Sequence, residues 1–402
     1  MTGLLFKYPH YVIFITAYAL SELAVTFLIR ISKRLGAIDR PELQAYKTQK
    51  EPVPFLGGLG LFIGFFGALA LSLRWGVIGD SGLSAFLEAQ ETRVAIAVLV
   101  GGAATALMGL VDDFRPIHAG LKLLGLCAIV AMLMYFGLVI QFPVYPALKF
   151  AVTLLWIVGV ISAFNAIDNT DGVAGTTAFY VSGFTFMIAW GASASEAQQG
   201  LSFLAIALAG ATLGFLRHNR PPAKVYLGNS GSFALGFLVA VMPISGRWAS
   251  PETATWETML PLLAPLLLVS YPLFDLCYTV FLRWRKGIVR NVVEAVVVSG
   301  RDHTAHRLSA LGLSKWQVLI VVGLMNGIAC VSALVLVRFG SNLWVALACI
   351  AVLGLAYLGF GRALRDAVDL RSPEARISNR KSTARITPAD REANRPTREV
   401  NA

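Results

Sequence analysis

The stretch WQVLIVVGLMNGIACVSALVLV, residues 316–337, contains no charged side chain. A helix needs about 20 predominantly apolar residues to cross a bilayer, so this stretch predicts a transmembrane helix. Similar apolar runs recur along the chain, and the run at 201–216 is short and contains two glycines, Gly210 and Gly214. The sequence therefore predicts an all-α polytopic membrane protein with ten or eleven transmembrane helices. The other predicted spans are 11–30, 55–76, 93–111, 121–141, 147–165, 173–191, 201–216, 231–246, 260–282 and 342–361.

The composition excludes several protein classes. Of 402 residues, 56% are hydrophobic and 14% are charged, with a mean hydropathy of +0.67. Soluble domains carry about 25% charged residues, so a soluble enzyme, a coiled coil and a disordered scaffold are excluded. All four cysteines fall inside apolar runs, which indicates neither a disulfide framework nor a zinc site. The first run has no basic segment before it and no cleavage pattern after it, so we expect a retained span.

The basic residues predict the orientation. With the N-terminus outside, the inside segments hold 28 of the 34 Lys and Arg residues. This excess follows the positive-inside rule, and it explains the net charge of +11 without a nucleic-acid partner. We therefore expect a transmembrane domain over residues 1–361. The basic segment 362–402, poor in large apolar residues, is expected to be a disordered cytoplasmic tail.

Dense polar clusters occur in four of the predicted inside loops, which places the working face in the cytoplasm. Asp112 and Asp113 end the third span, and Lys122 opens the fourth. Adjacent carboxylates repel one another unless a cation or a shared proton neutralises them. Two solvated loop aspartates are the alternative interpretation of this pair.

The second cluster lies between spans five and six. Residues 165–172 read Asn-Ala-Ile-Asp-Asn-Thr-Asp-Gly. An Asx-rich turn in which Asp171 caps the next helix is the alternative. A cap needs one such residue, however, and the loop supplies four.

The third and fourth clusters suit anions. Gly-Asn-Ser-Gly-Ser at 228–232 precedes a predicted helix, whose N-terminal N–H groups favour negative charge, and Lys224 is nearby. Residues 301–307, Arg-Asp-His-Thr-Ala-His-Arg, suit phosphate better than zinc, because no further ligands of matching spacing follow. A flexible turn and a solvated basic loop are the respective alternatives.

Asp275 differs from these clusters because it lies inside the ninth span. Ionisable residues at membrane depth are functional candidates. An ion pair with Arg283, two turns later, is the structural alternative. Together, helix N-termini, basic residues and carboxylates in one layer are what a divalent metal with a bound diphosphate requires.

Five motifs in this order resemble one family, the polyprenyl-phosphate N-acetylhexosamine-1-phosphate transferases. The motifs are Pro-x-Pro-x-x-Gly-Gly at 52–58, Gly-Leu-Val-Asp-Asp at 109–113, the 165–172 stretch, Pro-Ala-Lys-Val-Tyr-Leu-Gly-Asn-Ser-Gly-Ser at 222–232 and Asp-His-x-x-His-Arg-Leu at 302–308. The resemblance covers about residues 45–315. It is greater to enzymes that initiate O-antigen, exopolysaccharide or teichoic-acid glycans than to phospho-MurNAc-pentapeptide translocase, which typically has three consecutive histidines in the last motif.

The resemblance implies the reaction of a UDP-N-acetylhexosamine with undecaprenyl phosphate, which gives undecaprenyl-diphospho-sugar and UMP in a bacterial inner membrane. It implies Mg²⁺ as the cofactor, with Mn²⁺ as an alternative, and it leaves a homodimer open. We see no Gly-x-x-x-Gly dimer face to support that dimer. The hexosamine, the glycan pathway and the polyprenol length are not predicted.

The resemblance also implies roles for individual residues. Matching positions give catalytic roles to Asp112, Asp113, His303 and His306. Substrate binding falls to Asn165, Asp168, Lys122, Lys224 and Arg307, and the metal ligands are Asp171 and Asn229.

Two of these positions depart from the family pattern. The family usually has Asp, a principal magnesium ligand, where this chain has Asn229, and Asn where this chain has Asp168. It also often has Asp where this chain has Ala174. We hypothesise that Asp168 supplies the metal-binding charge that Asn229 lacks.

Two alternatives belong to other functional classes. One is a transporter or lipid-handling protein on the same scaffold, and the other is a non-catalytic partner of a true transferase. Transporters keep their polar residues near the bilayer midplane, whereas here the acidic clusters lie at span ends, which favours the enzyme.

Overall fold

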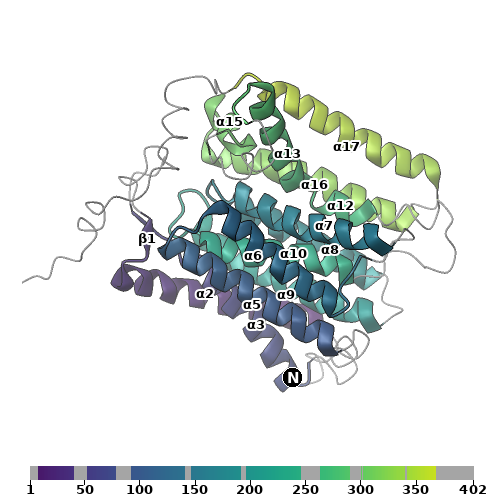
Figure 1. The fold of residues 1–402 in the computed structure, drawn as a ribbon. Coiled ribbons are helices and arrows are strands. Elements are labelled where there is room, and N and C mark those ends of the chain that lie inside the picture. Colours follow the sequence, from purple (N-terminus) through teal and green to yellow (C-terminus); the bar gives the residue numbers. More distant parts are fainter. Residues whose placement is uncertain are drawn as a thin grey trace, which may run out of the picture.

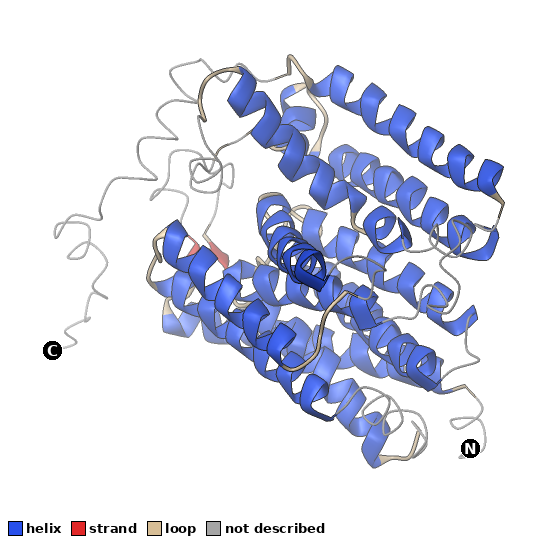
Figure 2. Ribbon diagram, turned by 45° about the vertical axis from the view of Figure 1, so that its right-hand side comes forward, coloured by secondary structure: helices blue, strands red, loops and turns tan. Residues whose placement is uncertain are grey.

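The computed structural model describes residues 8–39, 52–77, 92–140, 146–191, 196–245, 263–289, 300, 302–339 and 342–367. These residues form a bundle of helices with one short antiparallel ribbon, β1 (Ile38–Asp39) with β2 (Val53–Pro54) (Figures 1 and 2). The helices are α2 (Pro9–Leu35), α3 (Gly57–Arg74), α5 (Thr92–Phe114), α6 (Ala119–Tyr135), α7 (Pro146–Ile167), α8 (Val173–Gly191), α9 (Glu196–Asn219), α10 (Gly228–Ser245), α12 (Ala264–Leu268), α13 (Ser270–Arg285), α15 (Thr304–Ala310), α16 (Lys315–Phe339) and α17 (Leu343–Leu364).

Each of the eleven predicted apolar runs contains a helix, so the all-α polytopic fold is confirmed. Among the described residues, eight helices are long and apolar enough to cross a membrane, and α6 and α10 are shorter apolar helices. The short run at 201–216 lies within α9, a 24-residue helix that is among the most buried spans. Most of the proposed tail, residues 368–402, lies outside the described residues.

The ninth run is not one continuous helix. It divides into α12 and α13 at Val269, where the backbone leaves the α region with φ −103° and ψ 16°. Pro272 lies three residues later and has no N–H to donate to the carbonyl of Leu268, so the helical hydrogen-bond ladder is interrupted there. The break separates α13, which carries Asp275, from the apolar turn before it.

Helix α2 packs between α3 and α9 along two stripes of glycine. Gly60 and Gly64 of α3, and Gly210 and Gly214 of α9, each lie so close to α2 that a Cβ would overlap it. Both pairs are Gly-x-x-x-Gly spacings, which allow helix backbones to approach closely in membranes. These spacings were not predicted as packing faces, and in the structure they join helices of one chain.

Two of the motifs found in the sequence, at 52–58 and 222–232, lie side by side in the structure. The backbone N–H of Tyr226 donates to Pro54 O at 2.7 Å, and Gly57 N donates back to Tyr226 O at 3.0 Å. The next pair, Gly58 N to Leu227 O, is also 3.0 Å. The 52–58 motif is therefore hydrogen-bonded to the segment that leads into α10.

The last third of the chain forms one side of the bundle. Figure 1 shows α13, α15 and α17 together, in green and yellow, with α2 and α3 in purple on the opposite side. Helix α7 packs against α13 and α16 packs against α8. The residues of the candidate site lie at or near the ends of the helices.

Candidate functional site

Asp112 accepts three hydrogen bonds within a group that we call the acidic cluster: Asp112, Asp113, Asn165, Asp168 and Asn229. Its Oδ2 accepts from Lys122 Nζ at 2.7 Å and from Asn229 Nδ2 at 2.9 Å, and its Oδ1 accepts from Ile117 N at 2.8 Å. The side chain is buried. Lys122, predicted to bind substrate, is therefore ion-paired to Asp112 and draws the start of α6 against the end of α5.

Asp113 occupies the N-terminus of α10. Its Oδ1 accepts from Asn229 N at 2.8 Å and its Oδ2 from Ser230 N at 3.1 Å. The glycine-rich start of this helix does hold an anion, as its composition suggested, but that anion is a carboxylate of the chain itself.

Asn229 and Asn165 connect this group to α7. Asn165 Nδ2 donates to Asn229 Oδ1 at 3.0 Å and to Ser232 Oγ at 2.9 Å. Asn229 thus uses its amide nitrogen on Asp112, its amide oxygen on Asn165 and its backbone N–H on Asp113. Its side chain is a neutral bridge between two other polar residues of the cluster.

Two glycines make this approach of helix ends possible. A Cβ on Gly109 would overlap the backbone carbonyl of Asn229, and a Cβ on Gly58 would overlap the Cα of Gly231. Any larger residue at either position would push α5 or α3 away from α10. The glycines of the 52–58 and 109–113 motifs are therefore needed for packing around Asn229.

Asp168 differs from its neighbours because its carboxylate has no hydrogen-bond partner among the described residues. It follows the end of α7 and is half-buried. Burial, together with the nearby carboxylate of Asp113, raises the pKa of Asp168 well above its usual range. A carboxylate in this position is stabilised by a proton or by a cation.

Asp171 belongs to a different set of contacts. Its Oδ2 accepts from Lys315 Nζ at 2.8 Å and from Ala223 N at 3.1 Å. It makes no capping bond to α8 in the structure; instead Gly172 N, at the turn before that helix, donates to Asn219 Oδ1 at 3.0 Å. Asn219 and Lys315 were not identified from the sequence, because nothing in their local pattern distinguishes them from other residues at helix ends.

The predicted metal ligands Asp171 and Asn229 thus lie in separate hydrogen-bond sets. No group of three or more His, Cys, Asp or Glu side chains suited to a metal occurs in the described part of the chain. Mg²⁺ is commonly held by one or two carboxylates, with waters and substrate phosphates as the other ligands. Asp113 and Asp168, two carboxylates close enough to repel, fit that requirement better than Asp171 and Asn229.

Two polar side chains of the segment before α10, Lys224 and Tyr226, are at least partly exposed. Lys224 is exposed, and its ammonium has no partner among the described residues. Tyr226 is half-buried, and burial together with the carboxylates of Asp171 and Asp168 raises its pKa. Lys224 is therefore an available cation beside a concentration of negative charge.

A second polar group, which we call the histidine loop, comprises residues 302–307. Arg283 donates to Asp302 through both Nε, at 2.7 Å, and Nη2, at 2.5 Å, and both side chains are buried. Burial opposes ionisation of Asp302, but the hydrogen bonds and charge of Arg283 outweigh it and hold the pKa of Asp302 below its usual value. This pair fixes the start of the loop to the end of α13.

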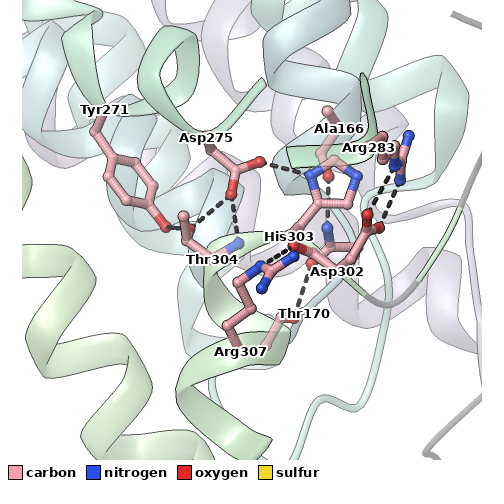
Figure 3. A network of polar contacts seen from close by, with 10 residues as sticks. Ala166, Thr170, Tyr271, Asp275, Arg283, Asp302, His303, Thr304 and Arg307 are labelled. Atoms are coloured by element: carbon pink, nitrogen blue, oxygen red, sulfur yellow. Dashed lines mark hydrogen bonds and ion pairs between the residues drawn. The ribbon is translucent and has the colours of Figure 1, made fainter. Parts of the chain in front are cut away.

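His303 lies immediately before α15, with an extended backbone. Its Nδ1 is 2.7 Å from Asp275 Oδ2 (Figure 3). The structural alternative for Asp275, an ion pair with Arg283, is wrong, because Arg283 holds Asp302 instead. His306 lies within α15 and is half-buried, whereas His303 precedes the helix as its N-cap residue.

Arg307 does not reach a substrate-facing surface in the structure. Its guanidinium is fully buried; Nε donates to Asp302 O at 2.6 Å, and Nη1 donates to the carbonyls of Leu364 and Arg365 at 3.3 and 3.4 Å. It lies 5.9 Å from the ring centroid of Tyr278. These contacts attach α15 to the C-terminal end of α17, so substrate binding by Arg307 stays a prediction that this geometry does not favour.

Comparison with known proteins connects these motifs to characterised chemistry. A family model described as Glycosyl transferase family 4 matches residues 95–247. The chain is 29% identical to a probable undecaprenyl-phosphate N-acetylglucosaminyl 1-phosphate transferase of Bacillus subtilis, over 84% of this chain and 88% of the relative. It is 28% identical to a decaprenyl-phosphate N-acetylglucosaminephosphotransferase of Mycobacterium tuberculosis, over 86% and 87% of the two chains. It is also 30% identical to a phospho-N-acetylmuramoyl-pentapeptide-transferase of Anoxybacillus flavithermus, over 58% of this chain and 72% of the relative.

Proposed function

The chain belongs to glycosyl transferase family 4, and on that premise we propose that it transfers an N-acetylhexosamine-1-phosphate from a UDP-sugar to undecaprenyl phosphate. Its relatives support the coarser activity, hexosamine-1-phosphate transfer to a polyprenyl phosphate for a glycan precursor. The UDP donor, the undecaprenyl acceptor and the initiation of a cell-envelope glycan are our proposal.

The observation that carries the proposal is the pair Asp113 and Asp168. Asp168 presents a half-buried carboxylate without a hydrogen-bond partner in the described chain, within electrostatic reach of Asp113. A diphosphate needs cationic charge beside it, and a divalent ion between these carboxylates and the diphosphate neutralises both sides. We therefore propose Asp113 and Asp168 as the residues that hold Mg²⁺, or Mn²⁺ in its place.

In the proposed reaction, an oxygen of the lipid phosphate bonds to the β-phosphorus of the donor, and the bond from that phosphorus to the bridging oxygen breaks. UMP leaves with the bridging oxygen. When bound, the metal supplies charge neutralisation and Lewis acidity at the diphosphate. A phosphate monoester is mostly a dianion at neutral pH. The main task of the protein is therefore to bring two negatively charged substrates together.

The protein residues serve that task by position and charge. Asp113 is fixed by the first N–H groups of α10, and Asp112 holds Lys122 close to the same helix end. Lys224 adds an exposed ammonium that is available to a phosphate. Asn165 and Asn229 keep α7 and α10 in register around the carboxylates.

We also propose that this end of the bundle faces the cytoplasm. Every residue of the acidic cluster and the histidine loop lies in or beside segments predicted to be inside. Outside the tail, those segments hold 18 of 24 Lys and Arg residues.

The test is UMP release by the purified full-length protein in detergent, with undecaprenyl phosphate and UDP-N-acetylglucosamine. We expect release that requires both substrates and is abolished by EDTA and restored by Mg²⁺. A panel of other UDP- and dTDP-hexosamines follows if this donor is inactive. If no donor in the panel gives UMP release although the protein is shown to bind the lipid, the proposal is overturned in favour of a non-catalytic protein on the same scaffold.

Two variants serve as controls for that assay. Asp168→Asn should strongly reduce metal-dependent release while the protein keeps its elution profile in detergent. Asp366→Asn changes a carboxylate that is 80% exposed and paired only to Arg365 in the structure. It should leave the rate unchanged, which separates a local loss of charge from a general effect of removing a carboxylate.

A further inference from the structure

Asp275 is a buried carboxylate inside α13 with both oxygens engaged by the histidine loop. Its side chain is 1% exposed. Oδ2 lies 2.7 Å from His303 Nδ1, and Oδ1 accepts from Thr304 N and Thr304 Oγ1, both at 2.6 Å (Figure 3). A buried carboxylate is costly unless it is paired and hydrogen-bonded, and here every bond goes to one imidazole or to the residue that follows it.

The same helix holds the other neighbour of His303. Arg283, eight residues after Asp275 on α13, binds Asp302 with two parallel hydrogen bonds. Tyr271, one turn before Asp275, places its hydroxyl 3.0 Å from Thr304 Oγ1. His303 therefore sits between two anchored residues, and its ring orientation is set by Asp275.

The contact determines which ring nitrogen remains for other chemistry. A carboxylate accepts hydrogen bonds and cannot donate one when ionised, so Nδ1 carries the hydrogen in the contact with Asp275. The structure gives Nε2 no partner among the described residues, and the His303 side chain keeps 11% of its surface exposed. A carboxylate on one ring nitrogen fixes the tautomer and directs the other nitrogen outward.

We propose that Asp275 is a positioning residue of the transferase: it holds His303 with Nδ1 protonated, so that Nε2 meets a substrate phosphate. This inference rests on the proposed function for the identity of the substrate. With Nδ1–H held by Asp275, Nε2 accepts a hydrogen bond from a protonated phosphate oxygen, or donates one when the ring carries both hydrogens. The loss of the Asp275 carboxylate therefore changes the imidazole without removing it.

Asp275→Asn is the substitution that isolates this effect. Its amide oxygen can still accept from Thr304 N and Oγ1, while its amide nitrogen occupies the place of Oδ2 and donates to Nδ1. The imidazole must then carry its hydrogen on Nε2, the opposite tautomer. The same carboxylate-to-amide change in a catalytic triad preserves geometry and leaves the wrong tautomer.

The tautomer is measured directly by NMR of the full-length protein with ¹⁵N-labelled histidine. The chain has five histidines, and the His303 signals are those missing from a His303→Gln sample. We expect Nδ1–H in the wild type and Nε2–H in Asp275→Asn. An Nε2–H wild type, or the same tautomer in both proteins, would overturn the proposal. The NMR measurement does not require enzymatic activity, so its result is independent of the transferase assay.

Kinetics test the consequence. We expect Asp275→Asn to lower kcat by about 10² to 10⁴-fold, the range seen when general acid–base groups are disabled, with a small change in KM. Asp302→Asn is the matched control, since it removes the charge and one of the two hydrogen bonds to Arg283 and leaves the contact between Asp275 and His303 in place. It should lower the melting temperature and keep the Nδ1–H tautomer. Equal kinetic losses in both variants with unchanged tautomers would assign Asp275 a merely structural role.

Discussion

In the histidine loop the carboxylates have partners inside the protein, because Arg283 holds Asp302 and the His303–Thr304 pair holds Asp275. In the acidic cluster Asp112 has Lys122, but Asp113 and Asp168 have no ionic partner among the described residues. The two regions lie at the same end of the bundle and are built from similar residue types. The buried carboxylates at the histidine loop are therefore hydrogen-bonded within the protein, whereas Asp113 and Asp168 need a proton or an added cation to offset their charge.

The largest expected effect concerns the buried ion pair between Arg283 and Asp302 at the histidine loop. Arg283→Met should lower the free energy of unfolding by about 3–5 kcal/mol, because it leaves the buried Asp302 without its partner. Thermal unfolding in detergent measures the loss. Lys122→Met is the comparison, since Lys122 is 29% exposed and Asp112 keeps two other hydrogen bonds. An equal loss in both variants would remove the distinction between the two regions.

The second prediction concerns the charge of the acidic cluster. Asp168→Asn should reduce UMP release by about 10² to 10³-fold, the cost of several kcal/mol of lost charge stabilisation. Asn229→Asp alone should also be impaired, because it places a carboxylate where an amide nitrogen now lies 2.9 Å from Asp112 Oδ2.

The double exchange decides whether the two positions compensate. Asn229 is hydrogen-bonded to Asp113, and the pKa of Asp168 is raised in part by Asp113, so Asp168→Asn with Asn229→Asp moves one negative charge between two positions that both influence Asp113. We expect the double variant to recover part of the activity lost in Asp168→Asn. If the double variant is inactive while the wild type is active, the hypothesis that the two positions compensate for each other is wrong.

A third, smaller effect is the pH dependence of stability in metal-free protein. Because the pKa of Asp168 is raised in the folded state, the folded state keeps its proton longer than the unfolded state. Its contribution to stability is full below the ordinary value, about 3.9, and is lost as the pH rises through the raised value. In EDTA at neutral pH, Asp168→Asn should therefore have a higher melting temperature than the wild type. The difference between the two melting temperatures should shrink as the pH falls toward 4. A gap that is constant with pH would contradict this assignment.

The smallest effect concerns Asp171 and Lys315. Lys315→Met should cost about 1 kcal/mol or less, because its side chain is 39% exposed and such pairs contribute little. Asp171→Asn should keep the wild-type Mg²⁺ concentration for half-maximal activity. A large increase in that concentration would return Asp171 to the metal site that the sequence suggested.

Much of the fold was predictable because apolar runs and helix ends are local properties of the chain. The broken ninth span had a local signal in Pro272, inside an apolar run. The partners Lys315, Asn219 and Arg283 had none, because their contacts join residues that are 19 to 144 positions apart or lie on different helices.

The site residues show the same division. The motifs predicted that Asp113 and Asp168 lie in one layer at the ends of the spans. They did not predict that Asp113 accepts two hydrogen bonds from α10, or that Asp168 has no hydrogen-bond partner among the described residues. It suggested Arg307 as a phosphate ligand from its charge and neighbours. Its burial against the end of α17 is a tertiary outcome that the local pattern does not contain.

The glycine stripes of α3 and α9 have a consequence for assembly during synthesis. His10 of α2 contacts Ser202 of α9, and Thr26 contacts His218, each across 192 residues of chain. At roughly 5–20 residues per second, the first span waits about 10–40 seconds for its second partner. During that interval its small and polar face must be tolerated by lipid or by the insertion machinery. Helix α10, which carries Asn229, emerges after α9, so the acidic cluster can form only after both helices that flank α2 have been synthesised.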